Sequence, residues 1–186
     1  MLKNKFDNFD DKNFIDKKVR LAGIINDSIV DGPGLRLAVF FQGCNRNCLG
    51  CHNPHAMSHN GGNIFSTREI LNIALSNKLL DGVTFTGGEP FLQSDSLYNL
   101  VEIFKKNNYH VAVYTGHTFD EILKEKKYVC VLNFTDILVD GAFIKNKKNL
   151  NLKYCGSSNQ RVIDIKKTLK DINNSEKKIC LNLDWL

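Results

Sequence analysis

The sequence contains no long apolar run, and none of its hydrophobic stretches approaches the roughly 20 residues that a helix needs to cross a bilayer. It also contains no block of five or six like charges, and its net charge is only +5. The first residues are polar and lack the apolar segment of a secretory signal. These absences argue against a membrane protein and against direct binding of nucleic acid. We therefore expect a cytoplasmic protein.

Internal repeats are also absent, and a length of 186 residues suits one domain. Residues 1–18 are rich in Asn, Asp and Lys, which predicts a polar N-terminal arm. Tighter apolar patterning begins at Val19, so we expect a single domain over residues 19–186. The hydrophobic content of 42% is enough for an ordinary core.

Apolar runs that are typical of strands alternate with segments that have the periodicity of helices. Two helix starts carry a capping box, in which Ser66 and Thr118 are each followed three residues later by Glu. The alternation indicates βαβ units and an α/β fold with a largely parallel sheet. We expect strands at 19–25, 35–41, 82–86, 110–115, 129–132, 137–139, 162–165 and 178–183, and helices at 66–77, 94–107, 118–127 and 166–172.

Polar motifs directly follow four of the expected strands. They are a cysteine-rich loop at 44–53, the Gly-Gly-Glu-Pro turn at 87–90, Thr115 and Asp140. The carboxyl ends of parallel strands lie at one edge of a sheet, and this edge is where α/β proteins bind ligands. The four motifs are therefore expected to share one rim.

The cysteine loop holds Cys44, Cys48 and Cys51 within eight residues. Three thiolates at this spacing can converge on a soft metal centre, but structural zinc and ordinary iron–sulfur sites take four protein ligands. A redox dithiol is one interpretation. Another is a zinc site completed by a nearby histidine, namely His52, His55 or His59. The interpretation we favour is an iron–sulfur cluster that keeps one coordination position open.

The other three cysteines are isolated in the sequence. Cys130 and Cys180 lie in apolar, strand-like runs, where a cysteine usually acts as a small buried hydrophobe. Cys155 lies in a loop beside Gly156, and its role stays open at this point. Disulfides are not expected in a reducing compartment.

The order of the motifs carries a family resemblance. A Cys-x-x-x-Cys-x-x-Cys loop after an apolar strand, with Gly-Gly-Glu-Pro after the next, resembles the radical S-adenosylmethionine enzymes. Residues 31–36 (DGPGLR), 40–44 (FFQGC) and 51–54 (CHNP) resemble the signature of the glycyl-radical activating enzymes. Segments 114–117, 139–143 and 156–164 are similar to the activating component of anaerobic ribonucleoside-triphosphate reductase. The likeness extends from about residue 19 to residue 165.

The resemblance implies a short, partial (β/α) barrel that is open enough on one side to admit a glycine loop of a large partner. It implies a [4Fe-4S] cluster on Cys44, Cys48 and Cys51, whose open iron binds S-adenosylmethionine. Reductive cleavage then yields a 5′-deoxyadenosyl radical that takes hydrogen from a glycine of the reductase, without a catalytic acid or base. The implied contacts to S-adenosylmethionine are Gly50, His52, Gly87, Gly88, Glu89, Thr115, Asp140 and Arg161.

Several of these contacts also have a local interpretation. Gly87 and Gly88 let the backbone approach a ligand without a Cβ, or form a plain strand-to-helix turn. Asp140 can accept from ribose or ammonium groups, or cap its loop. Arg161 can bind a carboxylate, or form a surface salt bridge.

The implied partners are the large subunit of anaerobic ribonucleotide reductase and reduced flavodoxin or another low-potential electron donor. One alternative is an activase of a different glycyl-radical enzyme, and another is a 7-carboxy-7-deazaguanine synthase. A further alternative, from a different class, is a non-enzymatic zinc or iron–sulfur module.

Overall fold

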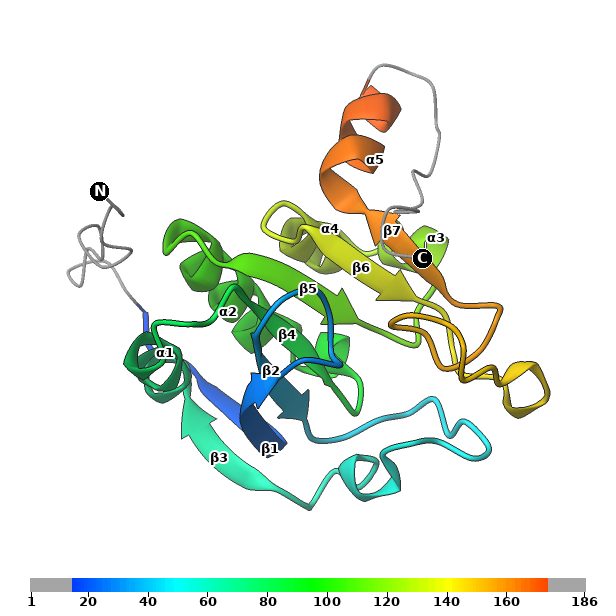
Figure 1. The fold of residues 1–186 in the computed structure, drawn as a ribbon, viewed down its shortest axis with the longest axis horizontal. Helices are drawn as coiled ribbons and strands as arrows, with labels where there is room; N and C mark the ends of the chain where they lie inside the picture. The colour runs from blue at the N-terminus through cyan, green and yellow to red at the C-terminus, as the bar shows by residue number, and fades with distance from the viewer. Residues whose placement is uncertain (1–14, 174–186) are drawn as a thin grey trace.

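The computed structural model describes residues 15–173, which form one seven-stranded sheet with helices packed on it (Figure 1). The strand order is β3-β1-β2-β4-β5-β6-β7. The strands are β1 Lys18–Ser28, β2 Arg36–Phe41, β3 Asn63–Ser66, β4 Gly82–Gly87, β5 His110–Tyr114, β6 Ile137–Asp140 and β7 Arg161–Asp164. Within residues 15–173, no helix combines the length and the apolar character of a membrane span.

The parallel strands lie in the middle of the sheet. β2, β4, β5 and β6 pair in parallel, whereas β1 is antiparallel to both β2 and β3, and β7 is antiparallel to β6. The two outer strands, β3 and β7, do not pair with each other, so the sheet formed by the described residues is open. The predicted α/β class with its parallel strands is confirmed. The antiparallel pairs involve β1, β3 and β7, which lie on either side of the parallel strands.

The helices are α1 Thr67–Ser76, α2 Ser94–Lys106, α3 Phe119–Ile122, α4 Lys126–Leu132 and α5 Ile165–Asn173, with 3-10 turns at Pro54–Ala56, Pro90–Gln93 and Lys145–Lys147. Two of the helices, α1 and α3, begin where the sequence places a cap. Both predicted capping boxes are present, at Ser66 and at Thr118. The four-residue strand β3, which has the sequence Asn-Ile-Phe-Ser, was not expected from the sequence.

Two expectations for residues 118–132 are wrong. The helix that starts after Thr118 ends at Ile122 instead of near residue 127. The apolar run 129–132, expected as a strand, is part of α4. A short apolar run does not separate helix from strand by periodicity. The segment packs against α2: just after the end of α4, the ring of Phe134 lies 5.7 Å from the ring of Tyr98 in α2.

The two ends of the chain are described only in part. Residues 1–14 of the predicted polar arm and the strand predicted at 178–183 lie outside the described residues. The last residues of the predicted arm contact α1, because the Asp16 carboxylate accepts from Thr67 Oγ1 at 3.1 Å and from the Arg68 amide at 3.0 Å. Lys18 already belongs to β1.

Alternate residues of each central strand face opposite sides of the sheet, as the two-residue period of a strand requires. In β5, Val111 and Val113 belong to the main apolar core, which includes buried residues of α1 and α2. Ala112 and Tyr114 belong to a smaller cluster that also includes Val139 and Cys155. The second face is therefore the one available for a site, because loops cover it in place of the main helices (Figure 1).

Arg36, at the start of β2, is fully buried and holds the β1–β2 loop (residues 29–35) on this second face. Its guanidinium donates to Thr84 Oγ1 at 2.5 Å, to the Val83 carbonyl at 2.5 Å and to the Pro33 carbonyl at 3.0 Å. The Thr84 hydroxyl in turn donates to the Asp31 carbonyl at 2.6 Å. Burial lowers the pKa of Arg36 to about 10, so the side chain stays charged at neutral pH.

Replacing Arg36 by Ala is expected to lower the free energy of unfolding by about 3–5 kcal/mol, since it leaves buried carbonyls unpaired and creates a cavity. Chemical denaturation under anaerobic conditions measures this change. Lys106→Ala is the matched control, because its ion pair with Glu102 is exposed and such pairs contribute about 0.3–0.5 kcal/mol. A loss below about 1 kcal/mol for Arg36→Ala would contradict this role.

Candidate functional site

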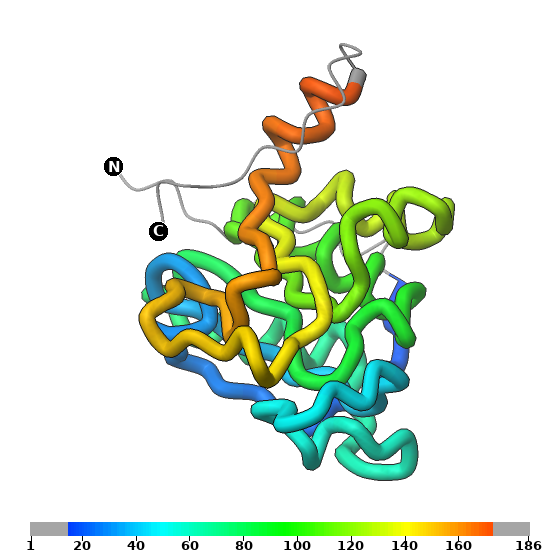
Figure 2. Tube along the Cα trace, turned by 90° about the vertical axis from the view of Figure 1, so that its right-hand side faces the viewer, coloured from blue at the N-terminus to red at the C-terminus, as the bar shows by residue number. Residues whose placement is uncertain are grey.

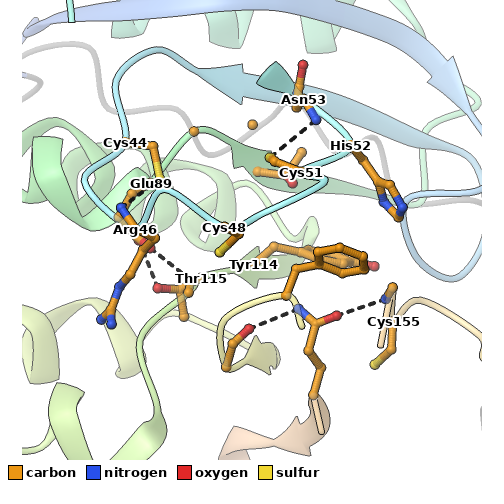
Figure 3. Close-up of a pocket in the computed structure, with 18 of the residues that line it drawn as sticks. Cys44, Arg46, Cys48, Cys51, His52, Asn53, Glu89, Tyr114, Thr115 and Cys155 are labelled. Carbon is orange, nitrogen blue, oxygen red and sulfur yellow. Dashed lines mark hydrogen bonds between the residues drawn. The ribbon is translucent and has the colours of Figure 1, made fainter. Parts of the chain in front are cut away.

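The loops that follow β2, β4, β5 and β6 meet at one edge of the sheet and enclose a cavity of about 560 Å³ (Figure 3). This volume is in the range of about 300–1,000 Å³ that is typical of small-molecule sites. Three of the four motifs predicted to share this rim line the cavity, namely the cysteine loop, the Gly-Gly-Glu-Pro turn and Thr115, whereas Asp140 does not. The predicted site residues that line the cavity are Cys44, Cys48, Cys51, His52, Gly87, Gly88, Glu89 and Thr115.

The cysteine loop turns tightly, so that all three sulfur-bearing side chains reach the same cavity. Asn47 and Gly50 adopt positive φ angles of 48° and 75°, which makes this turn possible. Backbone amides point at two of the sulfurs: Arg46 N lies 3.5 Å from Cys44 Sγ, and Asn53 N lies 3.4 Å from Cys51 Sγ (Figure 3). Amide donors of this kind tune the reduction potential of cysteine-bound clusters.

The donor set fits a cluster better than a single ion. In the described part of the chain, no three His, Cys, Asp or Glu side chains converge as the ligands of one metal ion do. His59, one candidate fourth zinc ligand, instead bonds to Asn45 Oδ1 through its Nε2 at 2.7 Å. An iron–sulfur cluster spreads its thiolate ligands over several irons, so three cysteines around a common cavity suit it. Burial raises the pKa of the Cys44 thiol, so a proton must leave when this cysteine binds a metal.

Gly87 and Gly88 are required by the packing of the protein on itself. A Cβ on Gly88 would lie 2.3 Å from the Gly43 carbonyl oxygen, and a Cβ on Gly87 would lie 2.5 Å from the Phe41 amide nitrogen. Gly87 also has a φ of +102°. The two glycines thus let the turn after β4 pack directly against the start of the cysteine loop, where the Glu89 amide donates to the Gly43 carbonyl at 2.8 Å.

Glu89 is 2% exposed, and its carboxylate joins the ends of β4 and β5. One carboxylate oxygen accepts from Thr115 Oγ1 at 2.8 Å and from the Phe91 amide at 3.1 Å, and the other accepts from the Gly116 amide at 2.8 Å. Burial raises the pKa of the carboxyl, while these donors and the nearby Arg46 guanidinium oppose the rise. Glu89 therefore holds Thr115 in the cavity wall.

Arg46 connects the cysteine loop to the start of α3. Its guanidinium donates to Glu121 Oε2 at 3.0 Å and contacts His117 Nδ1. Burial and the adjacent Arg46 lower the pKa of His117, so the imidazole is neutral beside the cation. Because the Glu121 carboxylate also caps α3, the contact ties the cysteine loop to a fixed helix end.

Three predicted contacts do not line the cavity: Gly50, Asp140 and Arg161. Asp140 is 1% exposed and accepts from Arg161 Nε at 2.9 Å, from Arg161 Nη2, and from the Phe119 amide at 2.7 Å. The expectation that Asp140 and Arg161 bind S-adenosylmethionine directly is not supported by this placement, because the Arg161 guanidinium and the Asp140 carboxylate form hydrogen bonds with each other. Gly50 faces the Lys145 side chain: a Cβ added to Gly50 would lie 3.4 Å from Cδ of Lys145.

The far wall of the cavity contains residues that the sequence reasoning did not single out. They come mainly from the β6–β7 loop (residues 141–160), where Phe143 lies against His52 with ring centroids 5.0 Å apart. Gln160 supports this loop by accepting from the Gly156 amide at 2.8 Å and donating to the Gly141 carbonyl at 2.9 Å. Tyr114, Phe143, Cys155 and Gln160 all line the cavity, and each lies within or beside a segment that carried the resemblance.

Comparisons with known proteins agree with this site. A family model described as a 4Fe-4S single cluster domain matches residues 30–163. The anaerobic ribonucleoside-triphosphate reductase-activating protein of Enterobacteria phage T4 is 32% identical, over 72% of this chain and 86% of that protein. The pyruvate formate-lyase-activating enzyme of Clostridium pasteurianum is 30% identical, over 85% of this chain and 79% of that protein. The chain belongs to the radical S-adenosylmethionine activating enzymes.

Membership in this family of radical S-adenosylmethionine enzymes identifies the cofactors as a [4Fe-4S] cluster and S-adenosylmethionine. Among solved structures, the crystal structure of QueE from Escherichia coli is similar over 54% of this chain and 54% of its own, with a TM-score of 0.44 and 17% identity.

Proposed function

We propose that this radical S-adenosylmethionine enzyme activates an anaerobic ribonucleoside-triphosphate reductase by generating a glycyl radical on it. The observation that carries the proposal is the single cavity into which three cysteines of one loop project together with Glu89 and Thr115. The match over 86% of the phage T4 activating protein supports this choice of target.

In this proposal Cys44, Cys48 and Cys51 hold the cluster. Bound there, the reduced cluster would supply the electron that cleaves S-adenosylmethionine to methionine and a 5′-deoxyadenosyl radical. His52 and Thr115, which both line the cavity, contact the bound S-adenosylmethionine. No side chain is assigned as an acid or base.

Other residues of the predicted set act by positioning in this proposal. Gly87 and Gly88 allow the turn after β4 to pack on the cysteine loop, and Glu89 orients the cavity wall beside it. Asp140 and Arg161 join β6 to β7 below the cavity rim. The electron comes from reduced flavodoxin or another low-potential donor, for which the cluster loop is the entry point.

Pyruvate formate-lyase is the second candidate target, favoured by the relative in Clostridium pasteurianum. Two sequence features favour the reductase. One is Gly50, at a position where the wider superfamily often carries an aromatic residue, and the other is the segment 114–117 (YTGH). The cofactors do not separate the two candidates, because both functions use the same cluster and S-adenosylmethionine. The two sequence features are independent of the cofactors.

The test mixes the anaerobically reconstituted protein with reductant, S-adenosylmethionine and one purified target at a time. We expect the electron paramagnetic resonance signal of a glycyl radical on anaerobic ribonucleotide reductase and none on pyruvate formate-lyase. A signal on pyruvate formate-lyase alone would transfer the assignment to the second candidate. Absence of methionine formation would reject both.

A further inference from the structure

Arg46 of the cysteine loop is the only lysine or arginine among the described residues that line the cavity. Two acidic residues, Asp31 and Glu89, line the same cavity together with the three cysteines of the loop. Cysteines bind a metal as thiolates, so the ligands of a bound cluster add further negative charge. One cation therefore offsets several anions in this cavity.

The wall opposite Arg46 supplies no second cation within residues 15–173. Arg46 and Cys155 lie on opposite sides of the cavity (Figure 3). The wall that includes Cys155 comes from the β6–β7 loop (yellow to orange) and the β1–β2 loop (blue), which Figure 2 shows side by side. Of the residues that these two loops contribute to the lining, Asp31 is an acid and none is a lysine or arginine. Lys145 faces Gly50 of the cysteine loop but does not line the cavity.

The segment that follows β5 holds the Arg46 side chain in place. The stem of Arg46 passes so close to Gly116 that a Cβ on this glycine would lie 2.9 Å from Arg46 Cγ. The Nη2 atom of Arg46 donates to Glu121 Oε2 at 3.0 Å and contacts His117 Nδ1. The His117 ring in turn packs on the Tyr128 ring, with centroids 5.5 Å apart. The Arg46 side chain is 26% exposed and that of Glu121 is 43% exposed, so solvent screens the cation less than its partner.

The charge of Arg46 acts on the groups around Cys44. Burial raises the pKa of Glu89, and the positive charge of Arg46 opposes this rise. Burial likewise raises the pKa of Cys44, and the negative charge of Glu89 adds to the rise. The backbone amide of Arg46 also points at Cys44 Sγ, at 3.5 Å. Arg46 and Glu89 are therefore opposite charges that both act at the cysteine loop.

We propose that Arg46 raises the reduction potential of the cluster held by this loop, and that Glu121 lowers it. Reduction adds one electron from a low-potential donor and hence one negative charge, and no bond forms or breaks in this step. Net charge near a cluster is one of the factors that set its potential, because a nearby cation stabilises the more negative, reduced state. The inference rests on the proposed function, because it takes the three cysteines of the loop as the ligands.

The test is a redox titration of the anaerobically reconstituted full chain, followed by the electron paramagnetic resonance signal of the reduced cluster. At the wild-type midpoint potential, Arg46→Gln is expected to lower the ratio of reduced to oxidised cluster about tenfold, which equals about 59 mV for one electron. Glu121→Gln is expected to raise this ratio, by a smaller factor because Glu121 is more exposed. The double variant is expected to lie between the two single variants.

The opposite signs separate the effect of charge from that of structure. Either single replacement breaks the same ion pair, so a purely structural role would shift the potential in the same direction in both variants. Glutamine at 121 still completes the capping box with Thr118, which keeps the start of α3 intact. Arg46→Lys keeps the charge and is expected to hold the ratio within about threefold of wild type. Shifts of the same sign, or an unchanged potential in either single variant, would overturn the proposal.

Lys106→Gln is the matched control. It removes one positive charge from an ion pair of similar length, because Lys106 Nζ lies 2.9 Å from Glu102 Oε1 in α2. Neither Lys106 nor Glu102 lines the cavity. The potential of this variant is expected to equal that of wild type. A shift as large as that of Arg46→Gln would show a general effect of net charge and would reject the role of Arg46.

The potential and the glycyl-radical signal distinguish failure of this inference from failure of the proposed function. Opposite shifts in the two single variants, with no glycyl radical on either target protein, would reject the proposed function and leave the role of Arg46 established. A glycyl radical on the reductase, with shifts of the same sign, would do the reverse. A reconstituted wild type that binds no four-iron cluster would reject both.

Discussion

The Cys48→Ala variant is expected to form no detectable methionine from S-adenosylmethionine, a loss on the order of a hundredfold or more. Cys48 is the middle of three cysteines that share one cavity wall, and its removal leaves two thiolates for a cluster that needs three from this loop. The same loss is expected for Cys44→Ala and Cys51→Ala. Absorbance and electron paramagnetic resonance spectra of the reconstituted variants measure the cluster, and chromatography measures methionine.

Cys130→Ala is the matched control for this series. Cys130 is a half-buried residue of α4 and does not line the cavity. Cys180, which the sequence also predicts to be tolerant of replacement, lies outside the described residues. Methionine formation by Cys48→Ala at more than about a tenth of the wild-type rate would contradict the ligand assignment, whereas unchanged formation by Cys130→Ala is expected.

The sequence predicts the position of the site because it predicts the central strands. β2, β4, β5 and β6 all come from apolar runs, and each is followed by a polar motif. Once these strands are parallel, their carboxyl ends must lie at one edge, so the cysteine loop, Glu89 and Thr115 come together without any knowledge of side-chain contacts.

The pairing of Asp140 with Arg161 could not be predicted in the same way. The sequence indicates a strand near residue 162 but not its direction. Because β7 is antiparallel to β6, its first residue, Arg161, pairs in register with the last residue of β6, Asp140. A parallel β7 would have placed these residues at opposite edges of the sheet. Strand direction therefore decides whether Asp140 is available to a ligand.

The role of the two glycines was also hidden at the level of sequence. Gly87 and Gly88 predict a close backbone approach, but the sequence does not say what approaches. In the structure it is the protein backbone at Gly43 and Phe41. The far wall escaped prediction for a related reason, since Phe143 and Cys155 reach the cavity only through the course of a long loop without helix or strand periodicity.

Glu89→Ala is expected to have the largest effect of any replacement in the cavity wall outside the cysteines. It removes the carboxylate that accepts hydrogen bonds from the Thr115 hydroxyl and from the Gly116 and Phe91 amides, and this carboxylate belongs to a residue that is 2% exposed. Each buried donor left unpaired costs about 1–3 kcal/mol, so we expect a loss of about 3–5 kcal/mol in the free energy of unfolding. Affinity for S-adenosylmethionine is expected to fall at least tenfold, because Thr115 is no longer oriented.

Glu89→Gln separates the charge of this residue from its geometry. The amide keeps one acceptor oxygen but turns an NH2 group toward either the Gly116 amide or the Thr115 hydroxyl, so an intermediate loss of about 1–3 kcal/mol is expected. Glu69→Gln is the matched control, since a glutamine also completes the capping box with Ser66. Denaturation measures stability, and calorimetric titration of the reconstituted enzyme measures binding. If Glu89→Ala kept both quantities near wild type, the carboxylate would not be what joins the ends of β4 and β5, and the Thr115 side chain would need another support in the cavity wall.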